Sequence, residues 1–596
     1  MELLDLDGVI EKGVFEIPSY QRGYAWQKEQ LKDFWNDLEH VSKLGNQFHY
    51  MHSLTLRESE NEFESSAFEI IDGQQRLATS LILLGLLAKT TQNKDPKYSS
   101  INLESVLSYK YYGLSEAFRA ITEEEKDLEA FKTSFYAKNL IKAYEFFKEE
   151  ISDTPVGTLE KMFDALIKKM LFSVAELNDN RIDPFSSFET INNRGKDLST
   201  LELLKNRLHF VAHKICDEGD LENLQNEIND TYTRIYYDLR HFKDDHLEGF
   251  LKHFVAYYYG EKRDFKERLL NTAFDAHKKY DDLYDEYEKI NDLLLHLSYS
   301  SKVWYFLHTL DDEELRIEIT PKMRGLLDKM RRLNALSENA FLPLLLSLLT
   351  IQLAVRSGSE RHYTTKELEG LLEYLERFGF LIYGVAGKNT AKNEWIESAF
   401  EAFKAYKLWE DKITIEDLPT LEKNFFKEKH SGLELLEEYI HSKKNTEKWY
   451  KWGKTLNYLL YEYELHHNPE TTLNFDSSIE SIEHILPQKP DQGYSAKEKS
   501  WAKNPHVVHA LGNLLLISKN ANSSLSNKPF EEKRKAYLKG SYSEKEVAKN
   551  ASFGITEIQQ RSEKLLDFLI ARYRIAELVG ENEIKDFKNA LLKDIK

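Results

Sequence analysis

The chain has 596 residues, with 81 Lys or Arg, 100 Asp or Glu and a formal net charge of −19. This length is too great for one hydrophobic core and predicts two to four domains. The acidic balance argues against passive coating of nucleic acid, and the single cysteine, Cys216, excludes a disulfide framework and argues against a cysteine-based zinc site. Scarce Gly and Pro favour a mostly helical α+β protein with short connections.

From the sequence we expect no targeting or membrane-spanning segment. Its N-terminus does not have the basic-then-apolar layout of a signal peptide. The two most apolar runs, 77–88 and 339–355, are too short or too polar to span a bilayer, and they predict buried helices. We therefore expect a cytoplasmic protein without a membrane partner.

The first part of the chain alternates short extended segments with helices. Residues 13–26, GVFEIPSYQRGYAW, predict a short strand followed by a loop, and the apolar spacing of 27–41 predicts an amphipathic helix. Residues 68–88 predict a short strand, a tight turn at Asp72-Gly73 and a buried helix.

Three polar stretches of this part group Gln, Asn, Asp and Arg around Gly; they are 17–26, 70–79 and 188–208. They supply three guanidiniums, those of Arg22, Arg76 and Arg194. Arginines that converge on one pocket favour phosphate or nucleotide binding, and the turn before the helix favours an anion at the helix N-terminus. Turns held by side-chain hydrogen bonds explain the same residues equally well. There is no Walker A motif, because GKN at 387–389 lacks the upstream Gly and the Ser or Thr.

The middle of the chain, residues 220–420, is mostly helical by its apolar spacing, with a surface loop expected near 384–395. Further helices follow after about residue 425. The pattern becomes mixed over 475–540, and the tail to residue 596 again predicts helix.

The mixed segment contains the residues that indicate chemistry. IEHILPQ, residues 482–488, places an acid and a histidine before two apolar residues and a proline. A loop of some twenty residues then leads to Asn513, which precedes the strand-like run LLLIS, and to Asn522 near a helix start. The segment thus resembles the ββα-metal or HNH nuclease fold. In order, it has a strand with Glu-His, a loop, a strand preceded by Asn, and a helix with Asn.

Phosphodiester cleavage needs an activated water and a way to stabilise the leaving oxygen. A neutral histidine can accept a proton from water near neutral pH, so His484 is expected to be the general base. A hard divalent ion, Mg²⁺ or Mn²⁺, prefers oxygen ligands, which predicts Glu483 and Asn522 as metal ligands. Asn513 is expected to fix the loop and to orient His484.

The basic stretch KPFEEKRKAYLK, residues 528–539, has two interpretations. Lys533 and Arg534 would contact the DNA backbone in one, and the stretch would be a solvated helix face in the other. His506 and His509 lie nearby, but no spacing assigns them a role.

Both ends of the chain resemble one family. IPSYQRGYAW, IIDGQQRLAT and FETINNRGKDLS resemble the N-terminal half of GmrSD-type modification-dependent, or type IV, restriction endonucleases. IEHILPQ and HALGNLLLISKNANSSLSNKPFEEKRKAYL resemble their C-terminal half, so the chain looks like a single-chain fusion of the GmrS-like and GmrD-like halves. On this basis we expect a ParB/sulfiredoxin-like domain over 1–220, a helical connecting region over 221–425 and an HNH domain embedded in helices over 426–596.

The resemblance also implies activities. The N-terminal domain of the family binds and hydrolyses a nucleoside triphosphate, such as ATP or GTP. The residues that would line or adjoin this pocket are Gln21, Arg22, Asp72, Gly73, Gln74, Gln75 and Arg76. Family members defend bacteria by cleaving phage DNA with modified bases, such as glucosylated hydroxymethylcytosine. Glu483 stands where many HNH nucleases have Asp, and a longer carboxylate can still bind a metal ion.

We therefore predict a nucleotide-regulated, metal-dependent endonuclease that cleaves modified phage DNA, with modified cytosine as the expected mark. The expected partners are double-stranded DNA with modified bases, a nucleotide and, as one arrangement, a second copy in a homodimer. Three alternatives stay open: a phosphorothioate-responsive nickase of the same family, an NTP-dependent DNA-binding switch with an inactive nuclease domain, and an RNA-directed toxin.

Overall fold

The computed structural model of the chain separates into two compact units, Met1–Phe306 and Leu307–Lys596. Among the described residues, no helix is long and apolar enough to cross a membrane. The structure describes residues 2–18, 20–45, 47–59, 67–91, 96–99, 101–110, 112–123, 125, 127–177, 198–240, 242, 244–275, 278–313, 315–355, 359–360, 362–426, 430–442, 444–445, 447–471, 473, 480–490 and 492–595.

Six strands of the first unit form one mixed sheet in the order β1-β6-β3-β4-β2-β5. The strands are β1 (Glu2–Leu4), β2 (Val14–Ile17), β3 (His49–Glu58), β4 (Ala67–Asp72), β5 (Leu107–Tyr109) and β6 (Met170–Glu176). β2 runs parallel to both of its neighbours, whereas β3 is parallel to β6 and antiparallel to β4. The strand, turn and helix predicted over 68–88 are confirmed by β4 and by α3 (Gln74–Thr90).

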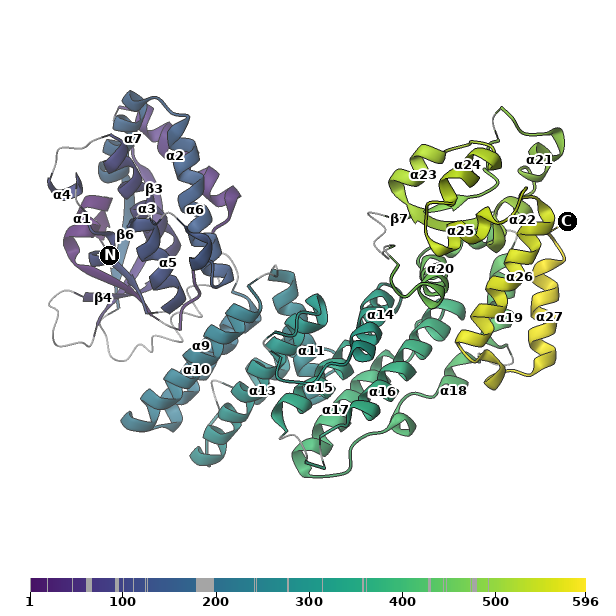
Figure 1. The fold of residues 1–596 in the computed structure, drawn as a ribbon. Coiled ribbons are helices and arrows are strands. Elements are labelled where there is room, and N and C mark those ends of the chain that lie inside the picture. Colours follow the sequence, from purple (N-terminus) through teal and green to yellow (C-terminus); the bar gives the residue numbers. More distant parts are fainter. Residues whose placement is uncertain are drawn as a thin grey trace. The chain divides into compact units, whose positions relative to one another are not determined.

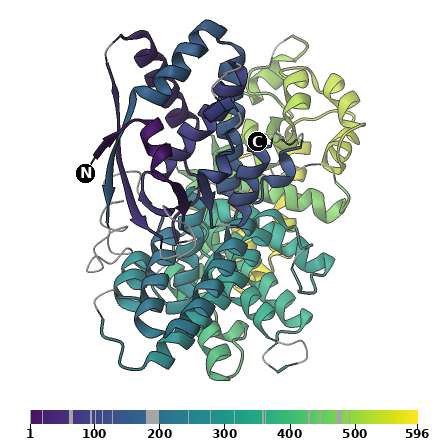
Figure 2. The ribbon, with the colours of Figure 1, turned by 90° about the vertical axis from the view of Figure 1, so that its left-hand side faces the viewer.

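Helices cover this sheet, and Figures 1 and 2 show them in purple and blue. They are α1 (Leu6–Lys12), α2 (Lys28–Lys43), α4 (Pro96–Ser99), α5 (Tyr112–Thr122), α6 (Phe135–Ser152) and α7 (Val156–Lys168), with the 3₁₀ turns η1 (Leu103–Ser105) and η2 (Glu129–Phe131). The helix predicted over 27–41 is confirmed by α2, whose buried face contains the expected apolar residues. α3 is apolar on nearly every side and lies buried against α6 and α7.

The rest of the first unit is helical. Its elements are α9 (Thr200–Ile215), α10 (Glu218–Asp238), α11 (Asp244–Tyr259), α12 (Phe265–Glu267), η3 (Arg268–Ala273) and α13 (Leu283–Thr309), and α13 runs across the division between the units. α9 packs against α10 and α11.

The second unit begins with a helical array, drawn in teal and green in Figure 1. Its elements are α14 (Pro321–Ser337), α15 (Leu342–Ala354), α16 (Thr365–Phe378), η4 (Gly379–Val385), α17 (Lys392–Leu408), η5 (Ile415–Asp417), α18 (Leu421–Phe425), α19 (Gly432–His441), η6 (Lys448–Trp452) and α20 (Lys454–His467). The apolar run 339–355 forms the buried helix α15, as predicted.

The surface loop expected over 384–395 is only partly present. Gly384 and Val385 are buried in η4, a π-helical turn, and α17 already begins at Lys392. The remaining connection, 386–391, has buried ends at Ala386 and Ala391. The polar residues of this stretch suggested full exposure, but its flanking apolar residues belong to the helical core.

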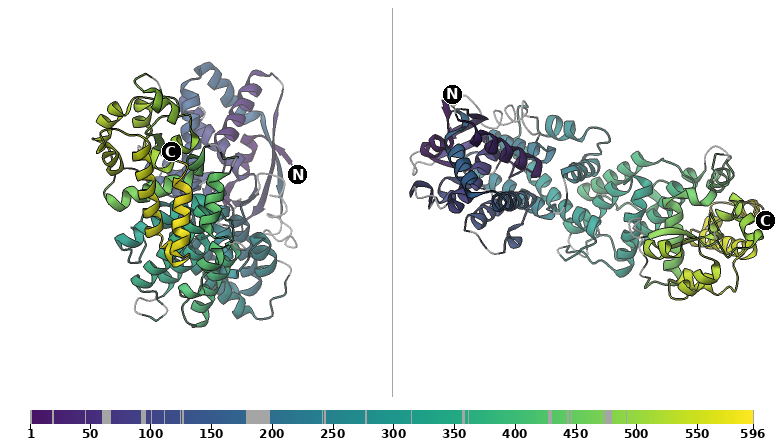
Figure 3. Two further views of the ribbon diagram at one scale, coloured as in Figure 1. Left: turned by 90° about the vertical axis from the view of Figure 1, so that its right-hand side faces the viewer. Right: turned by 90° about the horizontal axis from the view of Figure 1, so that it is seen from above.

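The C-terminal elements surround a small hairpin and appear in green and yellow in Figure 3. They are β7 (Glu480–His484), α21 (Ala496–Trp501), α22 (Pro505–Val508), η7 (Leu511–Asn513), β8 (Leu514–Ser518), α23 (Lys519–Leu525), α24 (Phe530–Tyr537), α25 (Tyr542–Ala548), α26 (Ile555–Arg572), η8 (Ile575–Glu577) and α27 (Glu581–Leu592). β7 and β8 pair antiparallel, from Glu480 opposite Ser518 to His484 opposite Leu514, and α23 packs on both strands. The predicted loop between the strands instead contains α21 and α22, each started by a capping side chain.

Candidate functional site

His484 is the last residue of β7 and lies in a half-enclosed group of aromatic and polar side chains. It is 8% exposed. Its Nε2 lies 3.1 Å from Nδ1 of His509, and the two rings meet edge to face with centroids 5.1 Å apart. The ring of Tyr450 is 4.8 Å away, centroid to centroid, and Gln488 Nε2 lies 3.4 Å from His484 Nδ1.

The surroundings of His484 keep its imidazole neutral. Burial lowers the pKa of His484 to about 3, and the neighbouring His509 and the ammonium of Lys533 act in the same direction. A neutral imidazole carries one N–H and one lone pair. At physiological pH His484 therefore keeps one lone pair free, and burial makes it a weaker base than a free imidazole.

Asn513 is completely buried and holds the turn after β7. Its Oδ1 accepts a hydrogen bond from the main-chain N of Leu486 at 2.7 Å. Its Nδ2 donates to the carbonyls of Leu486 at 2.9 Å and Val508 at 2.7 Å. Val508 ends α22, directly before His509. One side chain thus fixes both segments that position the histidine pair.

Glu483 takes part in a buried ion pair. Its Oε1 lies 2.6 Å from Nζ of Lys533 and accepts a second hydrogen bond from the hydroxyl of Tyr537 at 3.1 Å. The side chain of Lys533 is 0% exposed. Burial raises the pKa of Glu483, and the charge of Lys533 opposes that rise. The structure thus places Lys533 in the interior, against the carboxylate, and not on an outer surface.

Asn522 lies on α23 next to β7. Its Nδ2 donates to Ser481 Oγ at 2.7 Å and to the carbonyl of Ile482 at 3.2 Å. Because side chains alternate along a strand, Ser481 and Glu483 share one face of β7 and His484 lies on the other. The structure thus brings Asn522 to the strand face that carries Glu483. Arg534 is half-buried and its Nε donates to the carbonyl of Ala548 at 2.8 Å.

Sequence patterns did not predict that three neighbours of His484 belong to the site. They are His509, Tyr450 and Gln488. His509 stands four residues before Asn513, and that short distance is the one local signal for it. Tyr450 comes from η6, 34 residues upstream, and nothing in the local sequence marks it.

The polar stretches of the first unit are joined by glutamine side chains. Gln21 Nε2 donates to the carbonyls of Ile70 and Ile71 at the end of β4. Gln74 Nε2 donates to the carbonyl of Arg22 at 2.9 Å. Gln75 donates to Gly23 O and accepts from Ala25 N, at 2.9 and 2.8 Å. The amides therefore hold the loop of 20–25 against the start of α3.

The turn itself is held by charge and by backbone geometry. Asp72 accepts hydrogen bonds from Ser53 Oγ at 2.9 Å and from Arg76 at 3.1 Å, and Arg76 also donates to the carbonyl of Ser53. Gly73 has φ +99°, and an added Cβ would lie 2.9 Å from that carbonyl. Only glycine adopts this conformation at little cost, so Gly73 is the pivot between β4 and α3.

Two buried polar atoms in this region have no hydrogen-bond partner among the described residues, Gln74 Oε1 and Arg76 Nε. Arg22 is 9% exposed, and its positive charge opposes the rise in the pKa of Tyr136 that burial causes. Tyr136 in turn bonds Glu202 on α9. The structure thus brings 17–26, 70–79 and α9 together, while Arg194 lies outside the described residues.

A cavity of about 790 Å³ in the first unit adjoins the same loop. Asn139, one of its lining residues, donates to the carbonyl of Tyr24 at 3.4 Å. Two acids, Glu145 and Glu149, also line it. Most of the remaining lining side chains are aromatic or basic. They are Trp26, Phe135, Phe146, Phe242, Lys28, Lys138, Lys142 and Arg240. Aromatic faces and ammonium groups together suit a nucleobase with its phosphate.

Fold and site define a protein of two functional parts, an α+β sheet unit with a polar turn cluster and a helical unit with a buried histidine pair on a hairpin. Two family models match these parts: GmrSD restriction endonuclease, N-terminal domain, over residues 3–209, and GmrSD restriction endonucleases, C-terminal domain, over residues 436–568. A comparison with curated proteins found no match.

The chain belongs to the GmrSD restriction endonuclease family and carries both characteristic domains. The predicted resemblance is confirmed. Membership implies modification-dependent cleavage of DNA and suggests a divalent metal ion as cofactor.

Proposed function

We propose that the protein is a nucleotide-regulated, metal-dependent endonuclease that cleaves phage DNA carrying modified cytosine. The observation that carries this proposal is the geometry at the end of β7, where a buried neutral histidine, His484, is held by His509 and by the turn that Asn513 fixes. This geometry supplies a positioned proton acceptor, which the hydrolysis of a phosphodiester requires.

In the proposed mechanism His484 donates its Nε2–H to Nδ1 of His509, so that Nδ1 of His484 carries the lone pair, and the reacting water would take the place of the Gln488 amide beside it. As the water oxygen bonds to phosphorus, its proton passes to this nitrogen and the bond to the leaving oxygen breaks. His509 is a positioning residue, because it fixes the tautomer and the ring orientation of His484. Asn513 keeps both segments in place.

Glu483 and Asn522 have the donor types that a hard divalent ion takes, but the Glu483 carboxylate is bonded to Lys533 and Tyr537, so an ion would bind there only if that ion pair opened. Glu483 offers a carboxylate, and Asn522 offers an amide oxygen, since its Nδ2 is the atom bonded to β7. When bound there, Mg²⁺ or Mn²⁺ would stabilise negative charge on the phosphate and on the leaving oxygen. Lys533 holds the Glu483 carboxylate in a defined position. Arg534, the next residue of α24, is half-buried and would contact the DNA backbone.

A panel of variants and DNA substrates tests the nuclease proposal. His484→Ala should lower the cleavage rate by at least 10²-fold, the low end for loss of a general base. His509→Ala should lower it less, and His509→Gln should restore part of the loss because its amide can still accept the hydrogen bond. His466→Ala, which changes an exposed histidine on α20, is the control. Undiminished cleavage by His484→Ala would refute the assignment.

The substrates in that panel are unmodified, methylated, hydroxymethylated, glucosylated and phosphorothioated DNA, each with Mg²⁺ or Mn²⁺ and with or without nucleotide. Cleavage confined to modified cytosine supports the proposal. Nicking of phosphorothioate DNA, or binding without cleavage, would support the corresponding alternative.

The nucleotide is proposed to bind at the start of α3, near Gln21, Arg22 and the turn of Asp72 and Gly73. The N–H groups of the first turn of a helix attract phosphate, and Arg76 adds a positive charge beside them. The unpartnered Gln74 Oε1 and Arg76 Nε support a ligand at this place.

Arg76→Ala and Asp72→Asn should reduce nucleotide turnover while the activity of His484→Ala toward nucleotide stays normal. Arg119→Ala, an exposed arginine on α5, is the matched control. Normal turnover by both site variants would remove the turn from the nucleotide pocket.

The 790 Å³ cavity is proposed to read the modified base. A base stacked on an aromatic side chain gains about 1–3 kcal/mol, so Trp26→Ala should weaken binding of modified DNA by roughly tenfold. Trp409→Ala, at a tryptophan that is 76% exposed in the second unit, is the control. Equal loss for modified and unmodified DNA would show that the cavity does not discriminate.

A further inference from the structure

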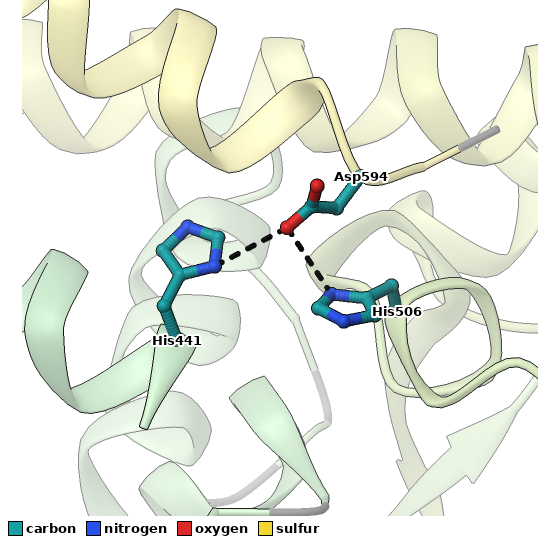
Figure 4. Close-up of side chains that lie close together, drawn as sticks. All are labelled: His441, His506 and Asp594. Atoms are coloured by element: carbon teal, nitrogen blue, oxygen red, sulfur yellow. Dashed lines mark ion pairs between the residues drawn. The ribbon is translucent and has the colours of Figure 1, made fainter. Parts of the chain in front are cut away.

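Two histidines and an aspartate meet at a place that the nuclease site does not use. His441 ends α19, His506 belongs to α22, and Asp594 follows α27, so three separate segments of the second unit contribute one side chain each. Figure 4 shows one carboxylate oxygen of Asp594 pointing between the two imidazole rings. This is the only group of three or more metal-ligand side chains found among the described residues.

The two distances from Asp594 suit a metal ion better than hydrogen bonds. Oδ2 of Asp594 lies 3.3 Å from Nδ1 of His441 and 3.5 Å from Nδ1 of His506. Charge-assisted N–H···O bonds are about 2.7–2.9 Å long. Zinc–nitrogen and zinc–oxygen bonds of about 2.0–2.2 Å in a tetrahedron separate neighbouring ligand atoms by about 3.3–3.5 Å.

The ring of His441 points to the same conclusion. Its Nε2 is buried and has no hydrogen-bond partner in the described part of the chain. In the tautomer whose proton is on Nε2, His441 presents a lone pair at Nδ1 toward Asp594 and His506. Each of the three residues keeps between a quarter and a third of its side chain exposed, which leaves a path for an ion from solvent.

We propose that His441, His506 and Asp594 form a second metal site, distinct from the nuclease site, which binds a transition-metal dication of the zinc type. Two imidazoles and one carboxylate are the donors that Zn²⁺ and Co²⁺ accept, and three ligands leave a fourth position for water. Mg²⁺ favours a shell of oxygen ligands and would bind this group poorly. The nearby ammonium of Lys448 acts on His506 and weakens the attraction for a cation, so the affinity is lower than with a second carboxylate.

The metal site is connected to the nuclease site through α22. His506 lies on the four-residue helix α22, and His509, three residues later, contacts His484. α27 and α19 already pack together, and Ser431 at the start of α19 bonds Glu583 of α27. A metal ion that joins His506 to His441 and Asp594 would fix α22 to this pair of helices. The site therefore acts as a structural clamp that positions the histidine pair.

The test measures binding of Co²⁺ and Zn²⁺ alone to the metal-stripped full chain, with no DNA or nucleotide present. Co²⁺ bound by two histidines and a carboxylate in a near-tetrahedral site gives visible absorption bands, and Zn²⁺ should displace it. Asn522→Ala serves as the background, so that the nuclease site contributes little to the signal. We expect one equivalent of Co²⁺, and a rise in Tm when Zn²⁺ is added.

Asp594→Asn and His506→Ala should abolish both the absorption and the rise in Tm. Asp594→Asn is the more informative variant, because it keeps the shape of a side chain that lies after the last helix and should leave the fold intact. His430→Ala is the matched control: its Nδ1 faces Glu434 at 3.7 Å, and no third ligand for this pair is found among the described residues. Co²⁺ absorption that persists in Asp594→Asn and His506→Ala, or the absence of tetrahedral Co²⁺ in the parent, would overturn the proposal.

Discussion

The ion pair of Glu483 and Lys533 shows how strongly one residue can depend on another 50 positions away. Both side chains are almost completely buried, at 4% and 0% exposure. Two charges in the interior lose their hydration, and their contact, the hydrogen bond from Tyr537 and the bonds from Lys533 to the carbonyls of His484 and Ile485 compensate that loss. The pair lies directly beside His484, so the stability of this pair and the geometry of the site are coupled.

Removing the charge of Lys533 alone should therefore lower the free energy of unfolding far more than removing the charges of both Lys533 and Glu483. Lys533→Met leaves an unpaired buried carboxylate and should lower the free energy of unfolding by about 3–5 kcal/mol. The double variant with Glu483→Gln should recover most of that loss, while cleavage stays impaired. Urea denaturation measures the first effect. Lys535→Met, at an exposed lysine of the same helix, should change stability by less than about 0.5 kcal/mol, and a comparable loss there would contradict the explanation.

Two buried bases on α9 predict how the first unit responds to pH. Burial lowers the pKa of Lys205 to about 7 and that of His209 to about 3. Their ordinary pKa values are 10.5 for Lys205 and 6.5 for His209. The unfolded chain therefore binds more protons than the folded chain between pH 7 and 10.5 at Lys205 and between pH 3 and 6.5 at His209. The free energy of unfolding should rise with pH in both windows, by at most about 1.4 kcal/mol per pH unit and group.

Denaturation by urea at pH 5, 7 and 9 checks this dependence. Lys205→Met should remove the rise between pH 7 and 9, and His209→Gln should remove the rise between pH 5 and 6.5. Each variant is the control for the other window. A wild-type stability that is flat over the whole range would contradict the burial of both bases.

At the scale of elements, the hairpin depends on its contact with α26. An added Cβ at Gly512 would lie 2.0 Å from the carbonyl of Ile558 and 2.6 Å from the main-chain N of Ser562. The main chain of Gly512 also accepts a hydrogen bond from Arg561, which bonds Leu514 of β8 as well. α26 thus holds the turn that leads into β8, and only glycine allows this close approach.

Gly512→Ala should destabilise the second unit by about 2 kcal/mol or more, because backbone on both sides cannot move aside easily. Gly325→Ala is the matched control, since its added Cβ at an exposed position of α14 meets no atom within 4 Å. There the substitution should stabilise by up to about 1 kcal/mol. Thermal denaturation should show a lower Tm for Gly512→Ala and an unchanged or higher Tm for Gly325→Ala. Equal shifts in Tm would show that the contact with α26 does not require glycine.

At the scale of the whole molecule, the division into two compact units has a direct consequence. The connection of 310–320 lies between α13 and α14, after the division at Phe306 and Leu307. Each unit has its own buried core, and the elements of the hairpin site all belong to the second.

A fragment of residues 311–596 should therefore fold cooperatively and keep metal-dependent cleavage, but lose any response to nucleotide. Circular dichroism and a cleavage assay test this. A fragment that starts at residue 372, within α16, removes half of a buried helix face and should not fold. Failure of the longer fragment to fold would show that the units are not independent.

Several features could be predicted from the sequence because they depend on local patterns. The helix at 28–43, the turn at Gly73 and the buried helices α3 and α15 follow from spacing and turn residues. The four strands β1, β3, β5 and β6 gave no such signal, since strand identity depends on partners across the sheet. The domain boundaries at 220 and 425 stay predictions.

The sequence by itself determined which residue types stand in the two clusters and in what order, because turn formers, strand-like runs and family motifs are contiguous. The tertiary structure alone decided that His509 meets His484, that Lys533 turns inward to Glu483, and that His441, His506 and Asp594 share one place. These contacts join residues 25 to 153 positions apart. Burial and charge pairing select them only when the core closes, and no local pattern records that choice.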